Sequence, residues 1–348
     1  MMMNPSKILF LMTLFSGTLV TICSDSWLGA WAGLEINLLS FIPLMTNSKN
    51  MMSTEASLKY FLIQAIASAI FLFSVLIMHL MVMLPSILEN LIPCLISSSL
   101  FLKTGAAPFH FWFPGVMEGL TWINSLILMT WQKIAPLMLL SYIIPINTFT
   151  SLIIITSIII GSLGGLNQTS LRKIMSYSSI NHMGWMIGGM MTGENTWMFY
   201  LLIYSLLTTC LCLMFYNFNI YYLTQCFTLT LDSTMKFSLF LTLLSLGGLP
   251  PFLGFLPKWL IIQSLTNLNQ WFTITIMVIA TLITVFFYLR LTFSSFLFTQ
   301  MELKWTNTPM YSSLLNTILF ILVNLGLSGL LLCTLVTSDY LLQDNLIM

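Results

Sequence analysis

Charged residues are scarce in this sequence. Only 6% of its 348 residues are Asp, Glu, Lys or Arg, whereas 58% are hydrophobic and the mean hydropathy is +0.95. A soluble domain carries about 25% charged residues, so this chain lacks the polar surface that such a domain needs. No polar stretch is long enough for a separate soluble domain either. The composition therefore predicts an all-α integral membrane protein, with residues 1–348 forming a single transmembrane domain.

Motifs that bind redox cofactors or nucleotides are also missing. The chain has no cysteine ligand set for an iron–sulfur cluster, no histidine pair spaced for haem, no GxGxxG motif and no Walker loop. Its six cysteines lie in or beside apolar runs without metal-ligand spacing, which favours buried small hydrophobic side chains. We therefore expect no cofactor and no metal in this chain.

The apolar N-terminus is expected to be the first membrane span. It has neither the small-residue cleavage site of a secretion signal nor the arginine-rich pattern of a transit peptide. Hydropathy and turn signals then predict about eleven spans joined by short linkers. They cover residues 5–23, 26–46, 56–84, 91–105 (continuing through a break to about 119), 121–143, 149–167, 171–191, 196–222, 236–264, 271–297 and 312–336.

The distribution of charge supports this count. With eleven spans, eight basic residues fall on the side of the N-terminus and none on the other side. They are Lys7, Lys49, Lys59, Arg172, Lys173, Lys236, Arg290 and Lys304. The positive-inside rule places such an excess in the cytoplasm or the mitochondrial matrix. We therefore expect the N-terminus to face that compartment and the C-terminus to lie on the opposite side.

Four ionisable residues remain deep in the predicted spans: Glu35, Lys103, Lys133 and Lys258. A charge at the centre of a membrane helix costs about 2.5–3.5 kcal/mol, so these groups must be solvated by cavity water or by one another. One interpretation is that they pair and only hold helices together. The other is a proton or ion relay, because burial tunes such groups towards the working pH. Three lysines cannot all pair with one glutamate, which favours the relay.

Two spans are interrupted by glycine and proline, at KTGAAP (103–108) and at GGLPP (247–251). Irregular backbone persists at membrane depth only where it is buried in protein or lines a cavity. Each break is in the fourth span of a block of five, 5–143 and 149–297, and each has a lysine beside it. Since five is odd, the two blocks are predicted to be inverted repeats, and matching breaks in such repeats indicate an ion path. Alternatively, Gly and Pro are simply common in membrane helices.

Other polar residues allow two interpretations each. His110, just past the first break, could take up protons from the basic side or be a packed histidine. His182, near mid-span, could bridge the two blocks or make a structural hydrogen bond. Glu118 could belong to the same path or have a loop or capping role. His79 has no polar neighbours in the sequence and is expected at the membrane interface.

Several long stretches resemble one known family. They are CSDSWLGAWAGLEINLLSFIP (23–43), STEASLKYFLIQA (53–65), KTGAAPFHFWFPGVMEGLTW (103–122), LMTWQKIAPL (128–137), GGLNQTSLRKIMSYSSINHMGWM (164–186) and SLGGLPPFLGFLPKW (245–259). They are similar to the antiporter-like membrane-arm subunits of mitochondrial NADH–ubiquinone oxidoreductase, respiratory complex I, with insect members nearest. The likeness extends along nearly the whole chain. This family is related to multi-subunit Na⁺/H⁺ antiporters.

The resemblance implies a proton-translocating subunit of the mitochondrial inner membrane, with its N-terminus in the matrix and its C-terminus in the intermembrane space. NADH, FMN, iron–sulfur clusters and ubiquinone would bind other subunits. Its partners would be a neighbouring antiporter-like subunit, small core membrane subunits and lipids such as cardiolipin, and not nucleic acid. A stand-alone cation/proton antiporter and a purely structural membrane subunit are the alternatives.

The resemblance also assigns roles to residues. It implies a hydrated proton relay made of Glu35, Lys103, Lys133 and Lys258, with His110 near the entry path and His182 between the halves. Family members usually have fourteen spans, and this chain resembles a version without the first three. The missing spans would open one flank to lipid or to a neighbour, so the resemblance does not imply a complete path within this subunit alone.

Overall fold

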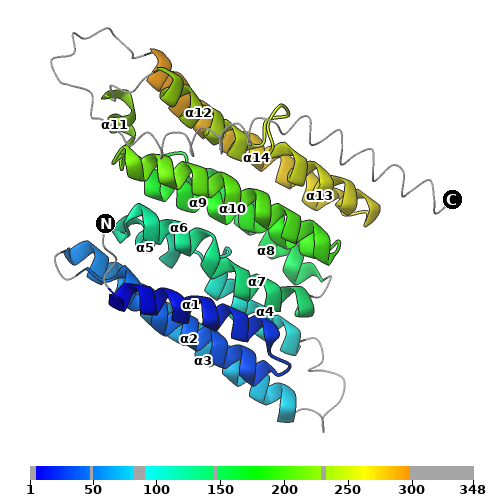
Figure 1. The fold of residues 1–348 in the computed structure, drawn as a ribbon. Helices are drawn as coiled ribbons and strands as arrows, with labels where there is room; N and C mark the ends of the chain where they lie inside the picture. Colours follow the sequence, from blue (N-terminus) through cyan, green and yellow to red (C-terminus); the bar gives the residue numbers. More distant parts are fainter. Residues whose placement is uncertain (1–4, 48–49, 81–90, 145–146, 229–232, 298–348) are drawn as a thin grey trace.

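The computed structural model describes residues 5–47, 50–80, 91–144, 147–228 and 233–297, and this part of the chain forms fourteen helices, arranged as in Figure 1. Their bounds are α1 (Pro5–Cys23), α2 (Trp27–Met45), α3 (Met51–Leu80), α4 (Leu91–Thr104), α5 (Trp112–Gly119), α6 (Trp122–Met129), α7 (Trp131–Ile143), α8 (Thr148–Gly164), α9 (Leu171–Met190), α10 (Glu194–Asn217), α11 (Leu223–Thr228), α12 (Ser233–Gly247), α13 (Phe255–Asn267) and α14 (Trp271–Leu297). The only other regular feature of the described residues is an isolated bridge between Ser170 and Tyr222. The all-α prediction is confirmed for these residues.

Several helices are long and apolar enough to cross a membrane. Among the described residues there are six such segments: Pro5–Cys23, Trp27–Met45, Met51–Leu80, Trp122–Ile143, Asn195–Asn217 and Trp271–Thr292. Three shorter apolar helices accompany them, at Leu91–Thr104, Thr148–Gly164 and Phe237–Gly247. Large apolar side chains also point outwards, as expected for a protein whose outer surface contacts lipid. The prediction of an integral membrane protein agrees with these features.

Most predicted spans coincide with helices to within a few residues. The spans predicted at 5–23 and 271–297 match α1 and α14. The span predicted at 196–222 is too long, because α10 ends at Asn217. Asn219 has a φ of 52°, the left-handed conformation in which asparagine commonly ends a helix. The predicted span at 312–336 lies outside the described residues.

Both predicted helix breaks are present. The first separates α4 from α5 and the second separates α12 from α13. Gly105 and Gly248 follow the first half-helix at each break, with φ values of 75° and 77°. A side chain strongly disfavours this left-handed backbone, so glycine is the residue that lets each half-helix stop here.

The predicted span at 121–143 is bent at Thr130. As one apolar segment, Trp122–Ile143, it is long enough to cross a membrane, and its helix divides at Thr130 into α6 and α7. The Thr130 hydroxyl donates to the Leu126 carbonyl at 2.8 Å, a bond that bends helices. Further along, Pro136 lies inside α7 and has no N–H to donate to the Gln132 carbonyl. The predicted span is therefore present, with a division at Thr130 that the sequence did not predict.

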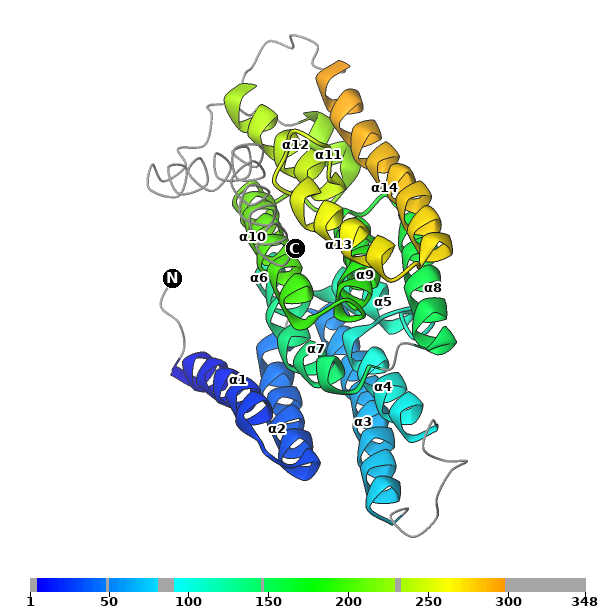
Figure 2. The ribbon, with the colours of Figure 1, turned by 90° about the vertical axis from the view of Figure 1, so that its right-hand side faces the viewer.

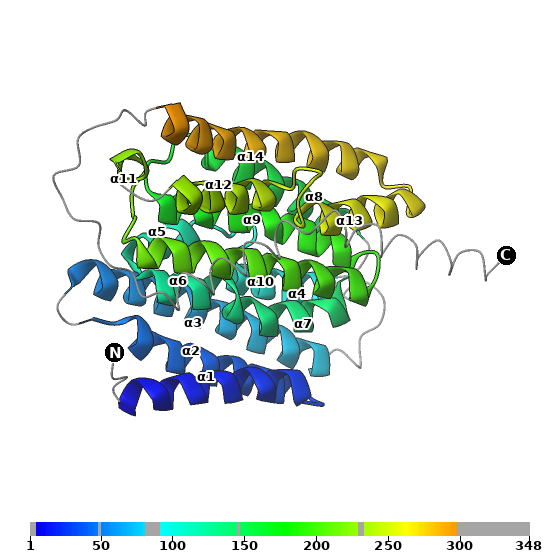
Figure 3. The same ribbon diagram turned by 45° about the horizontal axis from the view of Figure 1, so that its top comes forward.

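The helices lie side by side in successive rows, as Figures 1 and 2 show. Helices α1–α3 form one flank, α12–α14 the opposite flank, and α4–α10 lie between them. Figure 3 shows the long helices running roughly parallel to one another. Helix α5 packs against α3 and α9, whereas α10 packs against α6 and α9. The two predicted blocks therefore meet along α5, α6, α9 and α10, in the middle of the molecule.

Candidate functional site

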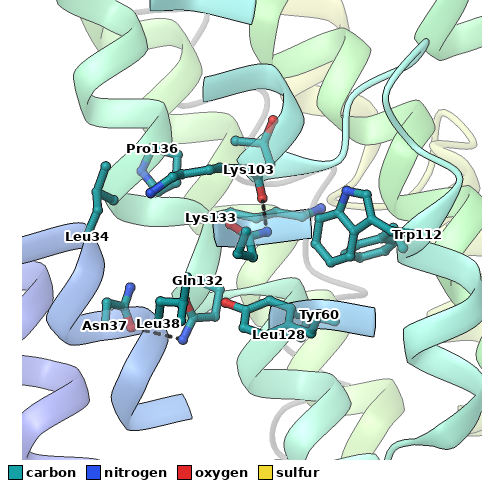
Figure 4. A pocket seen from close by; sticks show the side chains of 13 residues that line it. Leu34, Asn37, Leu38, Tyr60, Lys103, Trp112, Leu128, Gln132, Lys133 and Pro136 are labelled. Carbon is teal, nitrogen blue, oxygen red and sulfur yellow. Dashed lines mark hydrogen bonds between the residues drawn. The ribbon is translucent and has the colours of Figure 1, made fainter. Parts of the chain in front are cut away.

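Lys103 and Lys133 line one cavity at the first helix break. It is bounded by α2, α3, α4, α5, α6 and α7 (Figure 4). The lining residues are Leu34, Asn37, Leu38, Tyr60, Gln64, Lys103, Thr104, Trp112, Phe113, Leu128, Gln132, Lys133 and Pro136. The cavity has a volume of about 20 Å³, and several of its lining groups are polar. It is therefore large enough to hold a water molecule.

The backbone at the break is partnered by side chains. Lys103 is in the last turn of α4, and its carbonyl accepts a hydrogen bond from Gln64 Nε2 of α3 at 3.2 Å. The Leu102 carbonyl accepts from Trp112 Nε1 of α5 at 3.1 Å. Both carbonyls belong to the end of α4, where no further helical N–H is available. The break is thus stabilised from α3 and α5, which also fixes where the Lys103 side chain begins.

Glu35 lies on α2 beside this cavity and is half-buried. It is the charged group that acts electrostatically on Lys103, although no ion pair within 4 Å joins the two in the described residues. In Figure 4 the Lys103 side chain runs towards Leu34, the neighbour of Glu35 on α2. The same view shows Gln132 hydrogen-bonded to Asn37, with Gln132 Nε2 donating to Asn37 Oδ1 at 2.9 Å.

Lys133 connects the two blocks. It is buried on α7, and in Figure 4 its side chain runs away from Lys103, towards Trp112. The ammonium makes a long hydrogen bond of 3.4 Å to the Ser179 carbonyl of α9. It also lies 5.0 Å from the ring centre of Tyr204 on α10 and 5.4 Å from that of Phe113, distances at which an aromatic ring attracts a cation.

His182 is buried on α9, near enough to Lys133 and Lys258 for both lysines to act on it electrostatically. Its Nδ1 and the Tyr200 hydroxyl of α10 are 2.7 Å apart, the length of a short hydrogen bond. A role as a bridge between the two blocks stays a prediction.

Lys258 occupies the second break. It follows the break, on α13, and its ammonium donates to the Gly247 carbonyl at the end of α12 at 2.8 Å. The ring centre of Trp185 on α9 is 5.9 Å away. A Cβ atom on Gly248 would lie only 2.9 Å from the lysine Cδ and Nζ atoms. The missing side chain of Gly248 therefore makes room for Lys258.

His110 and Glu118 lie apart from this series. His110 is buried, with Nδ1 3.3 Å from the Pro108 carbonyl, and its ring packs on Phe111. It does not line the cavity of Lys103. Glu118 lies in the last turn of α5 and forms an ion pair of 2.8 Å with Lys173 of α9. His79 is exposed at the end of α3.

The sequence reasoning missed several uncharged groups of the site. Tyr200, Tyr204 and Ser179 surround Lys133 and His182, and Gln64 holds the carbonyl of Lys103. Tyrosine and serine are not unusual in membrane helices, so nothing in the sequence marks Tyr200, Tyr204 or Ser179. Gln64 did have a signal, because it is a polar residue at mid-span in FLIQAIA.

Metal-ligating side chains do not cluster in the described residues, where no three His, Cys, Asp or Glu lie together. The cysteines among them are free thiols. The expectation that this chain holds no cofactor stays a prediction.

Comparison with known proteins identifies a family and close relatives. The family described as "NADH:quinone oxidoreductase/Mrp antiporter, TM" matches residues 24–284. NADH-ubiquinone oxidoreductase chain 2 of Anopheles gambiae is 54% identical over 96% of this chain and 99% of its own length, and that of Aedes aegypti has the same identity and coverage. A chain of respiratory complex I from Thermus thermophilus superposes with a TM-score of 0.85 at 26% identity, covering 94% of this chain and 78% of its own.

Proposed function

Because the chain belongs to the NADH:quinone oxidoreductase/Mrp antiporter transmembrane family, we propose that it translocates protons as a core membrane-arm subunit of mitochondrial respiratory complex I. The complex is an H⁺-translocating NADH:ubiquinone oxidoreductase. NADH oxidation and ubiquinone reduction take place in other subunits, which also bind NADH, FMN, the iron–sulfur clusters and ubiquinone. The high identity to insect chain 2 proteins and the likeness to a complex I chain support this assignment.

Protons move along the series Glu35, Lys103, Lys133, His182 and Lys258. The observation that carries this proposal is the polar cavity shared by Lys103 and Lys133, because it has room for water that would connect two buried lysines, neither of which has an ion pair among the described residues. Beyond it, Lys133 bonds to α9, and both Lys133 and Lys258 act electrostatically on His182. Asn181 Oδ1 and Trp185 Nε1, on the same helix as His182, are buried polar atoms without a partner in the described part of the chain, and ordered water is the usual partner of such atoms.

The electrostatic interaction between Glu35 and Lys103 can supply the energy needed to move one proton across the membrane. A proton moved across about 150–180 mV requires roughly 3.5–4 kcal/mol. Two unit charges interact by about 4 kcal/mol at about 4 Å and by about half that at about 8 Å, with an effective dielectric constant near 20. Opening a closed Glu35–Lys103 pair from about 4 Å to about 8 Å therefore changes the energy by about 2 kcal/mol, roughly half the cost of one proton, and full separation by about 4 kcal/mol, which is comparable to the whole cost. Redox chemistry in the other subunits would drive that separation through the membrane arm.

The entry of protons and the neighbours of the subunit complete the proposal. His110 supplies protons from the matrix side, and its burial next to the first break supports that role. The half-buried position of Glu35 leaves one flank to be covered by a small core membrane subunit, while a neighbouring antiporter-like subunit adjoins the opposite flank. Anionic lipids such as cardiolipin bind at the matrix side, where the basic residues gather.

The proposal also includes the number of spans, their orientation in the membrane and the repeat within the chain. The chain has about eleven spans in the inner membrane, with its N-terminus in the matrix and its C-terminus in the intermembrane space. Residues 5–143 and 149–297 are inverted repeats, and 312–336 is the last span. The two breaks support the repeat, because in each of them the first half-helix is followed by a glycine of positive φ, Gly105 or Gly248.

The test is the substitution Lys103→Met in the assembled complex, reconstituted in vesicles. Loss of a positioned proton-transfer group slows a reaction by about 10²-fold or more, so NADH-driven proton pumping should fall by at least that factor. Lys59→Met is the matched control, because Lys59 is exposed and its ion pair among the described residues is with Glu55 on its own helix. It should pump normally.

Each alternative predicts a different result. A purely structural subunit would retain full turnover and pumping in Lys103→Met and Lys133→Met once assembly is verified. A stand-alone antiporter would exchange Na⁺ for H⁺ in vesicles that contain only this chain. Unchanged proton pumping in Lys103→Met would remove the relay from this subunit.

A further inference from the structure

Tyr204 fills the interval between Lys133 and His182. It lies on α10 and is only 3% exposed. Its ring centre is 5.0 Å from the Lys133 ammonium and 4.9 Å from the centre of the His182 ring. These two residues come from different blocks, α7 and α9, so Tyr204 contacts both ends of the crossing from one block to the other.

The buried hydroxyl of Tyr204 makes no hydrogen bond of good geometry to a described residue. Its polar neighbour is the Ser179 hydroxyl, which is close enough for a weak interaction but already donates its own proton to the Ser176 carbonyl at 2.7 Å. The Ser179 carbonyl accepts the bond from Lys133. Tyr200, on the same helix, differs because its hydroxyl bonds to His182 Nδ1. A buried hydroxyl without a partner is unfavourable, and an ordered water molecule is the usual remedy.

Packing alone does not account for this hydroxyl. The cation–π contact to Lys133 and the ring contact to His182 need only an aromatic ring. Phenylalanine would provide that ring without burying an unpartnered oxygen. The hydroxyl therefore needs a role of its own, at a point where two proton-carrying side chains are close but not bonded to each other.

We propose that Tyr204, with a water molecule on its hydroxyl, passes the proton between Lys133 and His182. This inference rests on the proposed relay function. The Lys133 ammonium gives a proton to the water, the water gives one of its protons to the Tyr204 oxygen, and the original hydroxyl proton of Tyr204 forms an N–H bond on His182 Nε2. Lys133 becomes a neutral amine and His182 an imidazolium, while the water and the Tyr204 hydroxyl each end with the number of protons they began with. Nε2 is free in the tautomer in which Nδ1–H donates to Tyr200.

Tyr204→Phe tests the hydroxyl and leaves the ring in place. In the assembled complex, NADH–quinone turnover coupled to pumping should fall about tenfold, because water alone replaces the hydroxyl poorly. Proton transfer then limits turnover, so replacing H₂O by D₂O should slow the variant more than the unmodified complex. A purely structural defect would not produce that isotope effect.

Tyr142→Phe is the control for the loss of a tyrosine hydroxyl. Tyr142 lies on α7, the helix of Lys133, but it is exposed and does not line the cavity of Lys103 and Lys133. It should retain turnover and a normal isotope effect. Equal losses in both variants would overturn the inference, because the loss would then not depend on the position of the hydroxyl.

A parallel Lys133→Met variant separates the two proposals. If Lys133→Met stops pumping and Tyr204→Phe does not, the role of Tyr204 is wrong and the relay stands. If both variants pump normally, both proposals are wrong. Independently of any variant, a high-resolution structure of the complex should show water within hydrogen-bond distance of the Tyr204 hydroxyl, and a dry hydroxyl there would contradict the inference.

Discussion

The two lysines at the helix breaks are stabilised in different ways. Lys258 reaches back over its own break and donates to the last residue of α12, where a helix end has free carbonyls and a partial negative charge. Lys103 instead ends its half-helix and directs its side chain towards the cavity and α2. Lys103 therefore faces a cavity that has room for water and is acted on by Glu35, whereas Lys258 has a direct protein partner. We therefore expect Lys103 to be the more responsive of the two to a change at Glu35.

Gly248→Ala should damage the site of Lys258 more than its small size suggests. The backbone at Gly248 has a φ of 77°, which costs a residue with a side chain about 1–2 kcal/mol, and the added methyl group would press on Lys258. We expect less assembled complex and weaker pumping per complex. Gly115→Ala is the control, because a Cβ there has no neighbour within 4 Å and α5 gains a better helix former. Similar losses in both variants would contradict the special role of Gly248.

At this scale the sequence allowed the charged residues of the site to be predicted, but not the neutral ones. Lys133 stands out because a charge in a membrane span is costly. Ser179 and Tyr204 do not stand out, since their contribution depends on which helices meet. Glu118 had a visible charge, but its ion-pair partner Lys173 lies on a helix distant in sequence and could not be predicted.

Helix breaks are the elements on which this site depends. Gly and Pro in KTGAAP and GGLPP predicted both breaks, because these residues stop a helix through local backbone geometry. The division at Thr130 was missed although Pro136 was visible, because proline inside a membrane helix produces either a kink or a break according to the surrounding contacts. The partners of the freed carbonyls come from helices distant in sequence, so they could not be predicted.

Gln64→Leu should weaken the attachment of α4 to α3. It removes the bond to the Lys103 carbonyl, and bonds between membrane helices contribute about 0.6 kcal/mol on average and up to about 1.7. The half-life of NADH–quinone reductase activity at a fixed high temperature should therefore shorten by roughly twofold to tenfold. Gln263→Leu, at an exposed position on α13, should leave the half-life unchanged. An unaffected half-life in Gln64→Leu would show that the break is held by other contacts.

One end of the whole molecule carries a set of contacts that joins the two blocks. The Arg172 guanidinium donates to the Leu120 carbonyl at 2.7 Å, Trp122 Nε1 donates to the Ile220 carbonyl at 2.9 Å, and Lys173 pairs with Glu118. These bonds connect the end of α5, the start of α6, the start of α9 and the turn after α10. They keep α5 and α9, which carry Phe113 and His182, at a fixed separation.

Arg172→Leu should be more destabilising than Lys173→Leu. Hydrogen bonds to charged groups contribute about 1.5–3 kcal/mol, and Arg172 also lies 4.9 Å from the Tyr221 ring centre. The Lys173–Glu118 pair is partly exposed, and such pairs contribute about 0–1 kcal/mol. Thermal inactivation of the assembled complex should rank the variants in this order. The reverse order would mean that the ion pair, rather than the guanidinium, joins the blocks.

The direction of the whole chain in the membrane can be tested with two cysteines. Asn50 and Asn195 are exposed next to the ends of α3 and α10. The proposed architecture places five crossings between them, made by α3, α4 with α5, α6 with α7, α8, and α9. Five is odd, so the two positions should lie on opposite sides, with residue 50 on the basic side.

An impermeant maleimide applied to right-side-out and inside-out inner-membrane vesicles distinguishes the possibilities. Asn50→Cys should be labelled only from the matrix side and Asn195→Cys only from the other side. The wild-type complex, treated with the same maleimide, is the control for labelling of the native thiols. Labelling of both positions from one side would mean that one of the shorter segments, such as the fourteen-residue α4 with its break, does not complete a crossing. The two blocks would then not be inverted, and the matching breaks would no longer indicate a single ion path through the subunit.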